Sequence, residues 1–350
     1  MTGWQSLFFP ALFYLCIGIA SAAGQSGTLR PDTLEYYRQQ AFNSPAAPAR
    51  FSLNHIGIAG ESVAGGYLVT AVLDDYPAHG AGIQRGDLII GADGSEFHPV
   101  FSYNERLRAP DRFQPRSQRS ELSVLRTERQ LRFVVTPVFE NLFDSYRSAT
   151  LNSVQQFASG NKSIGYVRLW ALSAATSDLI SYARIFAELE ATDGIILDLR
   201  NADGFLSTDQ LGLIYRGTDN LPRISSDDSR RLLKQPAVPL APVAYRNPVA
   251  ILINQDTEGG AELMAYQLDK LTRVITLGRT TAGRIGRYVP VRTPEGPALR
   301  YLPGDKLRID GQAFENQGHA PEQEVNHGPG RSGRLDLQFQ TAFDVLMEII

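Results

Sequence analysis

The chain has 350 residues, more than one ordinary domain contains, so we expect two folded units. Its 43% hydrophobic and 20% charged residues, with 31 glycines and 20 prolines, are typical of a globular chain and argue against disordered, fibrous and multi-span membrane proteins. The formal charge of -3 argues against an extended basic face for nucleic acid. The only cysteine, Cys16, allows neither a disulfide framework nor a cysteine-based metal site.

An apolar run of 14 residues, from Leu7 to Ala20, lies near the amino terminus and is followed by small residues up to Gly24. This pattern predicts a secretory signal peptide over residues 1–22, and therefore a periplasmic or secreted protein. No Lys or Arg precedes the run, which is shorter than the roughly 20 apolar residues that span a bilayer. An uncleaved signal is the alternative, and it is the only membrane contact that we expect.

A linker over residues 23–49 contains one expected helix, from Leu34 to Phe42, with Asp32 as its N-cap and the prolines after Ser44 as its end. Short β-type runs, separated by Gly, Pro and Asp, then predict a small strand-rich module over residues 50–138. The expected strands are Ile56 to Ala59, Tyr67 to Val72, Leu88 to Ala92, Glu121 to Arg126 and Leu131 to Val135.

A different pattern begins near Phe143, where β-type runs alternate with helical segments. This alternation predicts an α/β domain over residues 139–350. Its expected strands are Tyr166 to Leu169, Gly194 to Leu199, Val249 to Ile253 and Val274 to Leu277.

The blocks His55–Gly60, Gly66–Val69 and Pro77–Ile90, followed by Asp93-Gly94, make the first module resemble a bacterial PDZ domain. A glycine before a strand lets backbone N–H groups converge on an anion. A peptide's C-terminal carboxylate would then bind at Ile56, Gly57 and Ile58 while its chain adds to the sheet edge. The alternative is that Gly57 only relieves a tight turn.

Five blocks of the second domain occur in the order expected of one enzyme family. They are Ile164–Trp170, Ile196–Asn201, Val249–Asn254, Gly278–Gly283 and Gly318–Val325. Together they resemble the C-terminal processing, or tail-specific, serine peptidases, which also carry a PDZ domain at this place in the chain. The resemblance implies a multidomain fold: a signal peptide, a β-rich PDZ domain and an α/β domain of the ClpP/crotonase type.

The catalytic positions implied by that resemblance do not hold catalytic residues. The family's nucleophile is a serine at the start of a helix, three residues before a glutamate, and the position three residues before Glu262 holds Gly259. The general base of its Ser-Lys members falls 25 residues further on, at Arg284. A guanidinium keeps its proton at physiological pH, so it cannot activate a hydroxyl.

Other parts of the implied site are present in the sequence. Gly204 and Gly260 fall where the family places its two oxyanion N–H donors, and Phe205 stands where the family has another glycine. The nearest hydroxyls are Thr257 and Ser207. Of the few lysines, Lys270 would lie about 16 Å from Gly259 along one helix, which is out of reach.

The remaining polar residues give weaker signals. Asp198 and Arg200 could orient a substrate, although such a pair at a strand end more often forms a structural ion pair. Glu315 and Glu322 are possible carboxylate bases with no spacing that sets them apart. The histidines show no metal-binding spacing, and we expect them on the surface: His55, His79, His98, His319 and His327. We expect no metal site and no cofactor.

The sequence therefore favours an exported, peptidase-derived protein that binds protein C-terminal tails and has lost cleavage. Two alternatives remain open, an active serine-type endopeptidase with an unaligned nucleophile and a purely structural assembly partner. Neither the partner nor the oligomeric state follows from the sequence.

Overall fold

The computed structural model describes residues 27–43, 51–106, 109, 112–173, 175–214, 224–225, 233–234, 244–304, 308–309, 311–326 and 336–350. The expected signal peptide lies outside these residues, and so does His327. Among the helices of the described part, none combines the length and apolar character needed to cross a bilayer.

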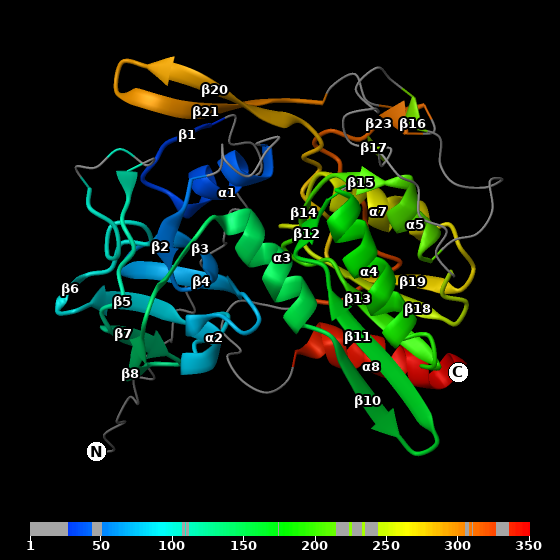
Figure 1. Cartoon of the computed structure of the whole chain (residues 1–350). Coiled ribbons are helices and arrows are strands. Elements are labelled where there is room, and N and C mark those ends of the chain that lie inside the picture. The colour runs from blue at the N-terminus through cyan, green and yellow to red at the C-terminus, as the bar shows by residue number, and fades with distance from the viewer. Residues whose placement is uncertain are drawn as a thin grey trace, which may run out of the picture.

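A β-rich module forms the first half of the fold (Figure 1). Its main sheet has the order β3-β4-β5-β7-β8, with β6 paired to β5, and β2 pairs with β9 beside it. The bounds are β2 Leu53–His55, β3 Ile58–Val63, β4 Gly66–Val72, α2 Pro77–Ala81, β5 Leu88–Ala92, β6 Ser95–Glu96, β7 Ser120–Arg126, β8 Arg129–Val135 and β9 Val138–Glu140. The expected strands are confirmed, except that Ile56 and Gly57 lie between β2 and β3 rather than within a strand.

The second half is built on a sheet of order β10-β11-β13-β18-β19-β24, in which β11 to β24 run parallel. Its strands are β10 Gln155–Ser159, β11 Lys162–Arg168, β13 Gly194–Asp198, β18 Val249–Ile253, β19 Val274–Gly278 and β24 Gln323–Glu324. Every residue of β13 and β18 is buried, which explains their unbroken apolar runs, because a parallel sheet is covered on both faces.

Helices cover both faces of this sheet (Figure 1). One face packs against α8, through Ala342 and Leu346, and the other against α4 and α7. The helices of this half are α3 Leu142–Asn152, α4 Thr176–Glu188, α5 Thr208–Gly212, α7 Gly260–Leu268 and α8 Leu337–Ile349.

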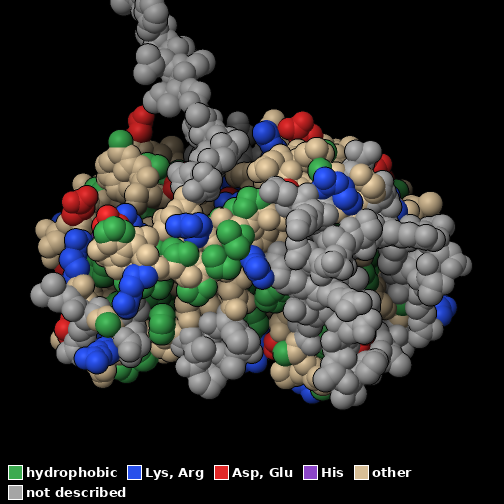
Figure 2. All heavy atoms as spheres, turned by 90° about the horizontal axis from the view of Figure 1, so that it is seen from above, with side chains coloured by type: hydrophobic (Ala, Val, Ile, Leu, Met, Phe, Trp, Pro, Cys, Tyr) green, Lys and Arg blue, Asp and Glu red, His purple; other side chains and the backbone are tan. Residues whose placement is uncertain are grey.

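A hairpin lies above both halves in Figure 1. It forms a sheet of order β1-β21-β20, from β1 Thr28–Leu29, β20 Arg287–Thr293 and β21 Gly296–Leu302. Seen from above in Figure 2, the described part of this face shows apolar side chains between Lys and Arg side chains. The other short strands are β12 Ala171–Leu172, β14 Asp203–Gly204, β15 Leu206–Ser207, β16 Ile224–Ser225, β17 Leu233–Lys234, β22 Arg308–Ile309 and β23 Gln312–Ala313.

The helix expected within the linker is confirmed as α1 Leu34–Asn43, but it is not a spacer. Most of its residues are buried, and Phe42 packs edge-on against Phe143 and Tyr146 of α3. Its cap also differs from the expected Asp32: the Tyr36 N–H donates to the Thr33 hydroxyl at 3.2 Å. The helix therefore belongs to the core of the first half.

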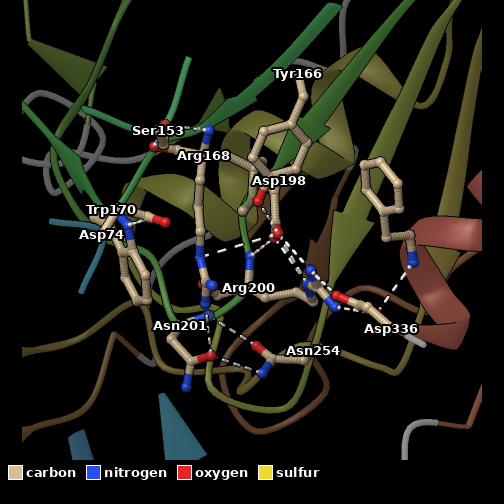
Figure 3. A network of polar contacts seen from close by, with 12 residues as sticks. Asp74, Ser153, Tyr166, Arg168, Trp170, Asp198, Arg200, Asn201, Asn254 and Asp336 are labelled. Atoms are coloured by element: carbon tan, nitrogen blue, oxygen red, sulfur yellow. Dashed lines mark hydrogen bonds and ion pairs between the residues drawn. The ribbon is translucent and has the colours of Figure 1, made fainter. Parts of the chain in front are cut away.

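That core crosses the expected domain boundary near residue 138. It includes residues of α3 and also Trp170, which follows β11 of the second sheet and has no exposed surface. The Trp170 indole N–H donates to Asp74 of the β-rich module at 2.9 Å, and the Arg168 guanidinium lies 3.5 Å from the centre of the Trp170 ring (Figure 3). The two halves are thus joined by buried side chains.

Candidate functional site

Gly259, the position implied for the nucleophile, lies at a sharp turn directly before α7. Its backbone has φ 60° and ψ -127°, a conformation that side chains other than glycine rarely adopt. A Cβ atom at this position would lie 2.8 Å from Asp203 Oδ1 and 3.2 Å from the Gly204 carbonyl oxygen. The turn therefore disfavours a side chain for two reasons, strain in the backbone and close contact with Asp203.

Arg284, the position implied for the base, lies beside this turn. Its carbonyl oxygen accepts a hydrogen bond from the Gly259 N–H at 3.1 Å, so the two implied positions are brought together. Its guanidinium forms an ion pair with Glu258 at 2.7 Å, and this carboxylate raises the pKa of Arg284 above its ordinary value. The residue is a fixed cation and cannot accept a proton from a hydroxyl.

The first implied oxyanion donor is already used. The Gly204 N–H donates to its neighbour, Asp203 Oδ1, at 2.6 Å. Asp203 is only 8% exposed, so its carboxylate holds a position close to both Gly204 and Gly259. An acyl oxyanion would have to displace a buried carboxylate to reach this donor.

Gly260, the position implied for the second donor, is the first residue of α7 and packs closely against the backbone of residues 204–206. A Cβ there would lie 2.4 Å from the Leu206 backbone nitrogen, so only a glycine allows α7 to approach so near. Gly204 and Gly259, together with Phe205 and residues of α1, line a cavity of about 30 Å³. Such a volume holds about one water molecule, not an extended peptide.

The residues that fill the cleft come from α1. The Arg38 guanidinium donates to Asp203 Oδ2 at 3.2 Å and also to Glu258 Oε1, and the Gln39 amide donates to the same two oxygens at 3.0 and 3.2 Å. The Arg38 guanidinium also binds Glu35 on its own helix at 2.8 Å. Asp203 and Glu258 therefore share one arginine and one amide from the same helix.

The pKa values of Asp203 and Glu258 are shifted in opposite directions. Burial, followed by the negative charge of Glu258, raises the pKa of Asp203 to about 7. Burial also acts to raise the pKa of Glu258, but Arg284 and Arg38 outweigh it, and the pKa of Glu258 is lowered. Near neutral pH Glu258 therefore carries a full negative charge, while Asp203 is close to the midpoint of its titration.

Glu262, which fixed the alignment of the implied site, has a structural role. It is fully buried, and its carboxylate accepts hydrogen bonds from Thr281 Oγ1, from the Gly283 N–H and from the Arg284 N–H at 2.7–2.9 Å. Burial raises its pKa to about 8 despite these donors. Glu262 thus holds the segment that carries Arg284 against α7.

A buried hydroxyl–imidazole–carboxylate cluster lies elsewhere, in the β-rich module and α3. Ser145 Oγ is 3.0 Å from His55 Nε2 and 2.7 Å from Glu140 Oε2. His55 Nδ1 accepts the Gly57 N–H, so the imidazole proton must be on Nε2 and the ring donates to Ser145. A ring that donates to the serine cannot act as its base, and the cluster is structural.

The side chain of Ser207 lies outside the described part of the structure, and the other alternative hydroxyl and bases are either committed to other contacts or exposed. Thr257 is fully buried and donates to the Leu199 carbonyl oxygen at 2.8 Å. Glu315 is buried and accepts from Tyr301 Oη and from the backbone N–H of Gly304, while Glu322 is exposed. The Lys270 ammonium lies 4.9 Å from the centre of the Tyr266 ring.

The expected surface position of the histidines is wrong for two of them. His55 is 2% exposed and His319 is 6% exposed, whereas His79 is exposed and His98 is half-buried. Burial lowers the pKa of His55 to about 4 and also lowers the pKa of His319. Burial disfavours the charged imidazolium, so both buried rings are held in the neutral form.

Asp198 and Arg200 form a structural pair, as their position at a strand end favoured. Figure 3 shows Arg200 between Asp198 and Asp336, at 2.5 and 2.6 Å. Although burial acts to raise it, Arg200 and Arg168 lower the pKa of Asp198. Because Asp336 is the N-cap of α8, this network fixes the C-terminal helix to the end of β13.

The expected carboxylate loop of the first module is partly occupied by the module itself. The Gly57 N–H donates to His55 Nδ1 at 3.1 Å, and the carbonyl oxygens of Ile56 and Gly57 accept from Ala78 and Leu73. Ile58 differs. The hydrogen bond from the Leu73 N–H to the Gly57 carbonyl oxygen makes Ile58 and Val72 a non-hydrogen-bonded pair of the antiparallel ladder. The main-chain groups of Ile58 therefore point to the outer edge of β3.

Sequence analysis missed the residues that dominate the site: Arg38, Gln39, Asp203 and Glu258. Asp203 and Glu258 each lie directly before a glycine that was singled out, which was the only signal available. Arg38 gave none, since its partner Glu258 is 220 residues away in the chain.

Comparisons with known proteins agree with the fold. Residues 163–325 match the family model of peptidase family S41. The chain is 28% identical over 228 residues to a carboxyl-terminal-processing protease of Synechocystis sp., covering 62% of this chain and 49% of the relative. It is 22% identical over 274 residues to the carboxy-terminal processing protease CtpA of Bacillus subtilis (strain 168), covering 77% of this chain and 56% of the relative.

The chain thus spans about half the length of the curated relatives it matches. Among solved structures, an S41 protease of Bacteroides fragilis NCTC 9343 superposes with a TM-score of 0.56 at 17% identity, covering 86% of this chain and 84% of that one. At this identity the similarity concerns the fold alone.

Proposed function

We propose that this chain, which belongs to the C-terminal processing peptidase family through residues 163–325, is a non-catalytic member that binds protein C-terminal tails. The observation that carries the proposal is the turn at Gly259. It has no hydroxyl, it lies beside a fixed cation instead of a base, and its space is limited by a buried carboxylate.

The loss of the nucleophile is accompanied by other changes at the same place. The Gly204 N–H donates a hydrogen bond to the Asp203 side chain, and the cavity beside Gly259 has a volume of only about 30 Å³. A cleft that needed only one substitution to become active would keep a free oxyanion donor and room for a peptide. Here one implied oxyanion donor is already bound, and the nucleophile and the base are absent, which supports a role other than cleavage.

Support for tail binding comes from the β-rich module, which we propose to be a PDZ domain. β3 is the outer strand of its sheet, and the main-chain groups of Ile58 point to that edge. The edge borders a cavity of about 120 Å³, lined by Ile58, Gly60, Arg38 and Arg284 among others. An extended tail could add to this edge as a further strand, with the two arginines near its carboxylate.

We also propose that the protein is exported, on the evidence of the apolar run from Leu7 to Ala20. N-terminal sequencing of exported material should find a mature chain beginning near Ala23. Recovery of chains that start at Met1 in a membrane fraction would instead indicate the uncleaved signal.

The direct test of the main proposal combines a fluorophosphonate probe with a cleavage assay on an unfolded substrate that has a free C-terminal tail. We expect no labelled peptide after digestion and no cleavage. Cleavage that the probe abolishes, with a labelled serine located by peptide mapping, would establish the alternative of an active endopeptidase. An active family member treated in parallel provides the positive control for probe and substrate.

A further inference from the structure

We propose that the remodelled cleft is a guanidinium-binding site, and that helix α1 is its internal ligand through Arg38. We call Asp203 and Glu258 the carboxylate clamp. This proposal rests on the proposed function in one respect: the cleft cannot hold helix α1 and a peptide that is being cleaved at the same time.

The geometry of the clamp matches a guanidinium and not a point charge. Arg38 presents Nη1 to Asp203 and Nη2 to Glu258, so two neighbouring nitrogens of one planar group bind two carboxylates from different segments. An ammonium group would have to make both contacts from one nitrogen, whereas a guanidinium makes them from two nitrogens held apart in one rigid plane. The Gln39 amide adds donors from a single nitrogen, Nε2, to the same two oxygens at 3.0 and 3.2 Å, so both carboxyl groups are held by two consecutive residues of α1.

Burial makes this contact specific. Arg38 is 9% exposed, Asp203 8% and Glu258 3%. Charges so far from water are stabilised only by partners with good geometry, and removal of one partner leaves the others unpaired in a medium of low polarity. The clamp therefore needs a cation, and Arg284 alone reaches only the other oxygen of Glu258, at 2.7 Å.

The position of α1 shows what its binding prevents. Gln39, Phe42 and Asn43 line the same cavity as Gly204 and Gly259, so the helix forms one wall of the cleft and fills the corner next to the clamp. The helix also contacts β20 and β21, which form another wall. An extended peptide could reach Gly259 only after α1 had moved away.

The test is chemical rescue of the full-length Arg38→Ala variant. This change leaves a space shaped for a guanidinium, and we expect a lower melting temperature than that of the wild type. Millimolar guanidinium chloride should raise the melting temperature of the variant, whereas ammonium chloride at the same ionic strength should not. In the control variant Arg132→Ala, which breaks an exposed ion pair with Glu121, guanidinium should give no such increase.

Equal effects of guanidinium and ammonium on a folded Arg38→Ala variant would overturn the proposal. If that variant does not fold, hydrogen exchange decides. In Glu258→Gln, amides of residues 34–43 should exchange faster than in the wild type while those of β18 stay protected, and unchanged protection of α1 would equally overturn it. The fluorophosphonate probe applied to Arg38→Ala keeps the two proposals separate, because labelling would contradict the non-catalytic function without affecting the rescue result.

Discussion

At the scale of single residues, the cleft is defined by one small residue and one acid that face each other. Gly259 has a backbone conformation that favours glycine, and Asp203 Oδ1 lies only 2.8 Å from the point where the Cβ of another residue would be. A change at Gly259 therefore acts on stability before it acts on chemistry.

Gly259→Ser is expected to restore no cleavage, alone or combined with Arg284→Lys, and to lower the free energy of unfolding by about 1–3 kcal/mol. The added Cβ is strained and meets Asp203. Gly259→Ala is the matched control, since it adds the same atom without a hydroxyl and should lose as much stability in urea unfolding. Cleavage by the serine variant and not by the alanine variant would show that the cleft can still be activated.

Asp203 should make the stability depend on pH in a direction opposite to that of most carboxylates. Its pKa in the folded protein is about 7, against an ordinary value of 3.8 in the unfolded chain. Between about pH 4 and 7 the folded state keeps a proton that the unfolded state has lost, so stability falls as the pH rises, by at most about 4 kcal/mol. Glu258 changes little there, because its lowered pKa places its titration below about pH 4.5.

The measurement compares urea unfolding of the wild type and of Asp203→Asn at pH 5 and pH 8. The asparagine has no proton to lose, so the part of the pH dependence that Asp203 causes should disappear. His55 and His319 are buried neutral in both proteins and contribute equally to both. Parallel pH profiles of the two proteins would mean that Asp203 is ionised throughout this range.

At the scale of secondary structure elements, long-range ion pairs hold two helices to the body of the fold. α1 is held by Arg38 at the clamp, and α8 is held by its N-cap Asp336, which binds Arg200. Arg200 is 6% exposed and Asp198 is fully buried, so water has little access to the contact between these two residues and cannot easily replace a lost partner there.

Arg200→Ala is accordingly expected to cost about 3–5 kcal/mol of unfolding free energy, because Asp198 would stay buried with only the Tyr166 hydroxyl at 3.0 Å and the more distant Arg168 at 4.0 Å as side-chain partners. The exposed pair of Arg132 and Glu121 offers the comparison, and Arg132→Ala should cost less than about 1 kcal/mol. Chemical denaturation of both variants tests this difference. Similar losses would show that the charge of Arg200 is compensated in another way.

The elements themselves could be predicted from the sequence wherever their signal is local. Val249–Ile253 is an unbroken apolar run, and it forms a strand with the expected bounds because both faces of a parallel sheet are buried. The range of α1 followed from its flanking residues in the same way. Its location did not, because helix signals describe the turns of one segment and say nothing of a partner such as Glu258, 220 residues away.

The same distinction separates the parts of the site that could be predicted from those that could not. Gly259 and Arg284 were found by counting from Glu262, and the structure brings them together through a main-chain hydrogen bond. The clamp escaped detection because an acid in a loop has no periodicity and is usually solvated. Only the fold reveals that Asp203 and Glu258 are buried next to each other.

At the scale of the whole molecule, the two halves are joined so that the outer strand of the first lies near the cleft of the second. Trp170 and α3 form part of the first core, and α1 packs against α3 while it contacts the clamp. The cavity beside β3 is lined by residues of both halves, including Tyr67 and Asn201. A tail bound at β3 would therefore lie next to α1 rather than on a separate, freely moving module.

This arrangement leads to the last prediction, that peptides with a free apolar C-terminus bind the full-length protein with micromolar dissociation constants, about 8 kcal/mol of binding free energy. Main-chain bonds to the edge at Ile58 would supply much of the affinity, so N-methylation of the peptide backbone should weaken binding. Amidation of the C-terminus should abolish it, because a neutral amide lacks the charge that the backbone N–H groups and nearby arginines stabilise. Isothermal titration with the acid, amide and N-methyl forms tests each contribution separately.

Since Gly259 is not among the residues that line the cavity beside β3, Gly259→Ala should bind the acid form as well as the wild type does. Equal affinity for acid and amide would place the peptide site elsewhere than the loop at Gly57.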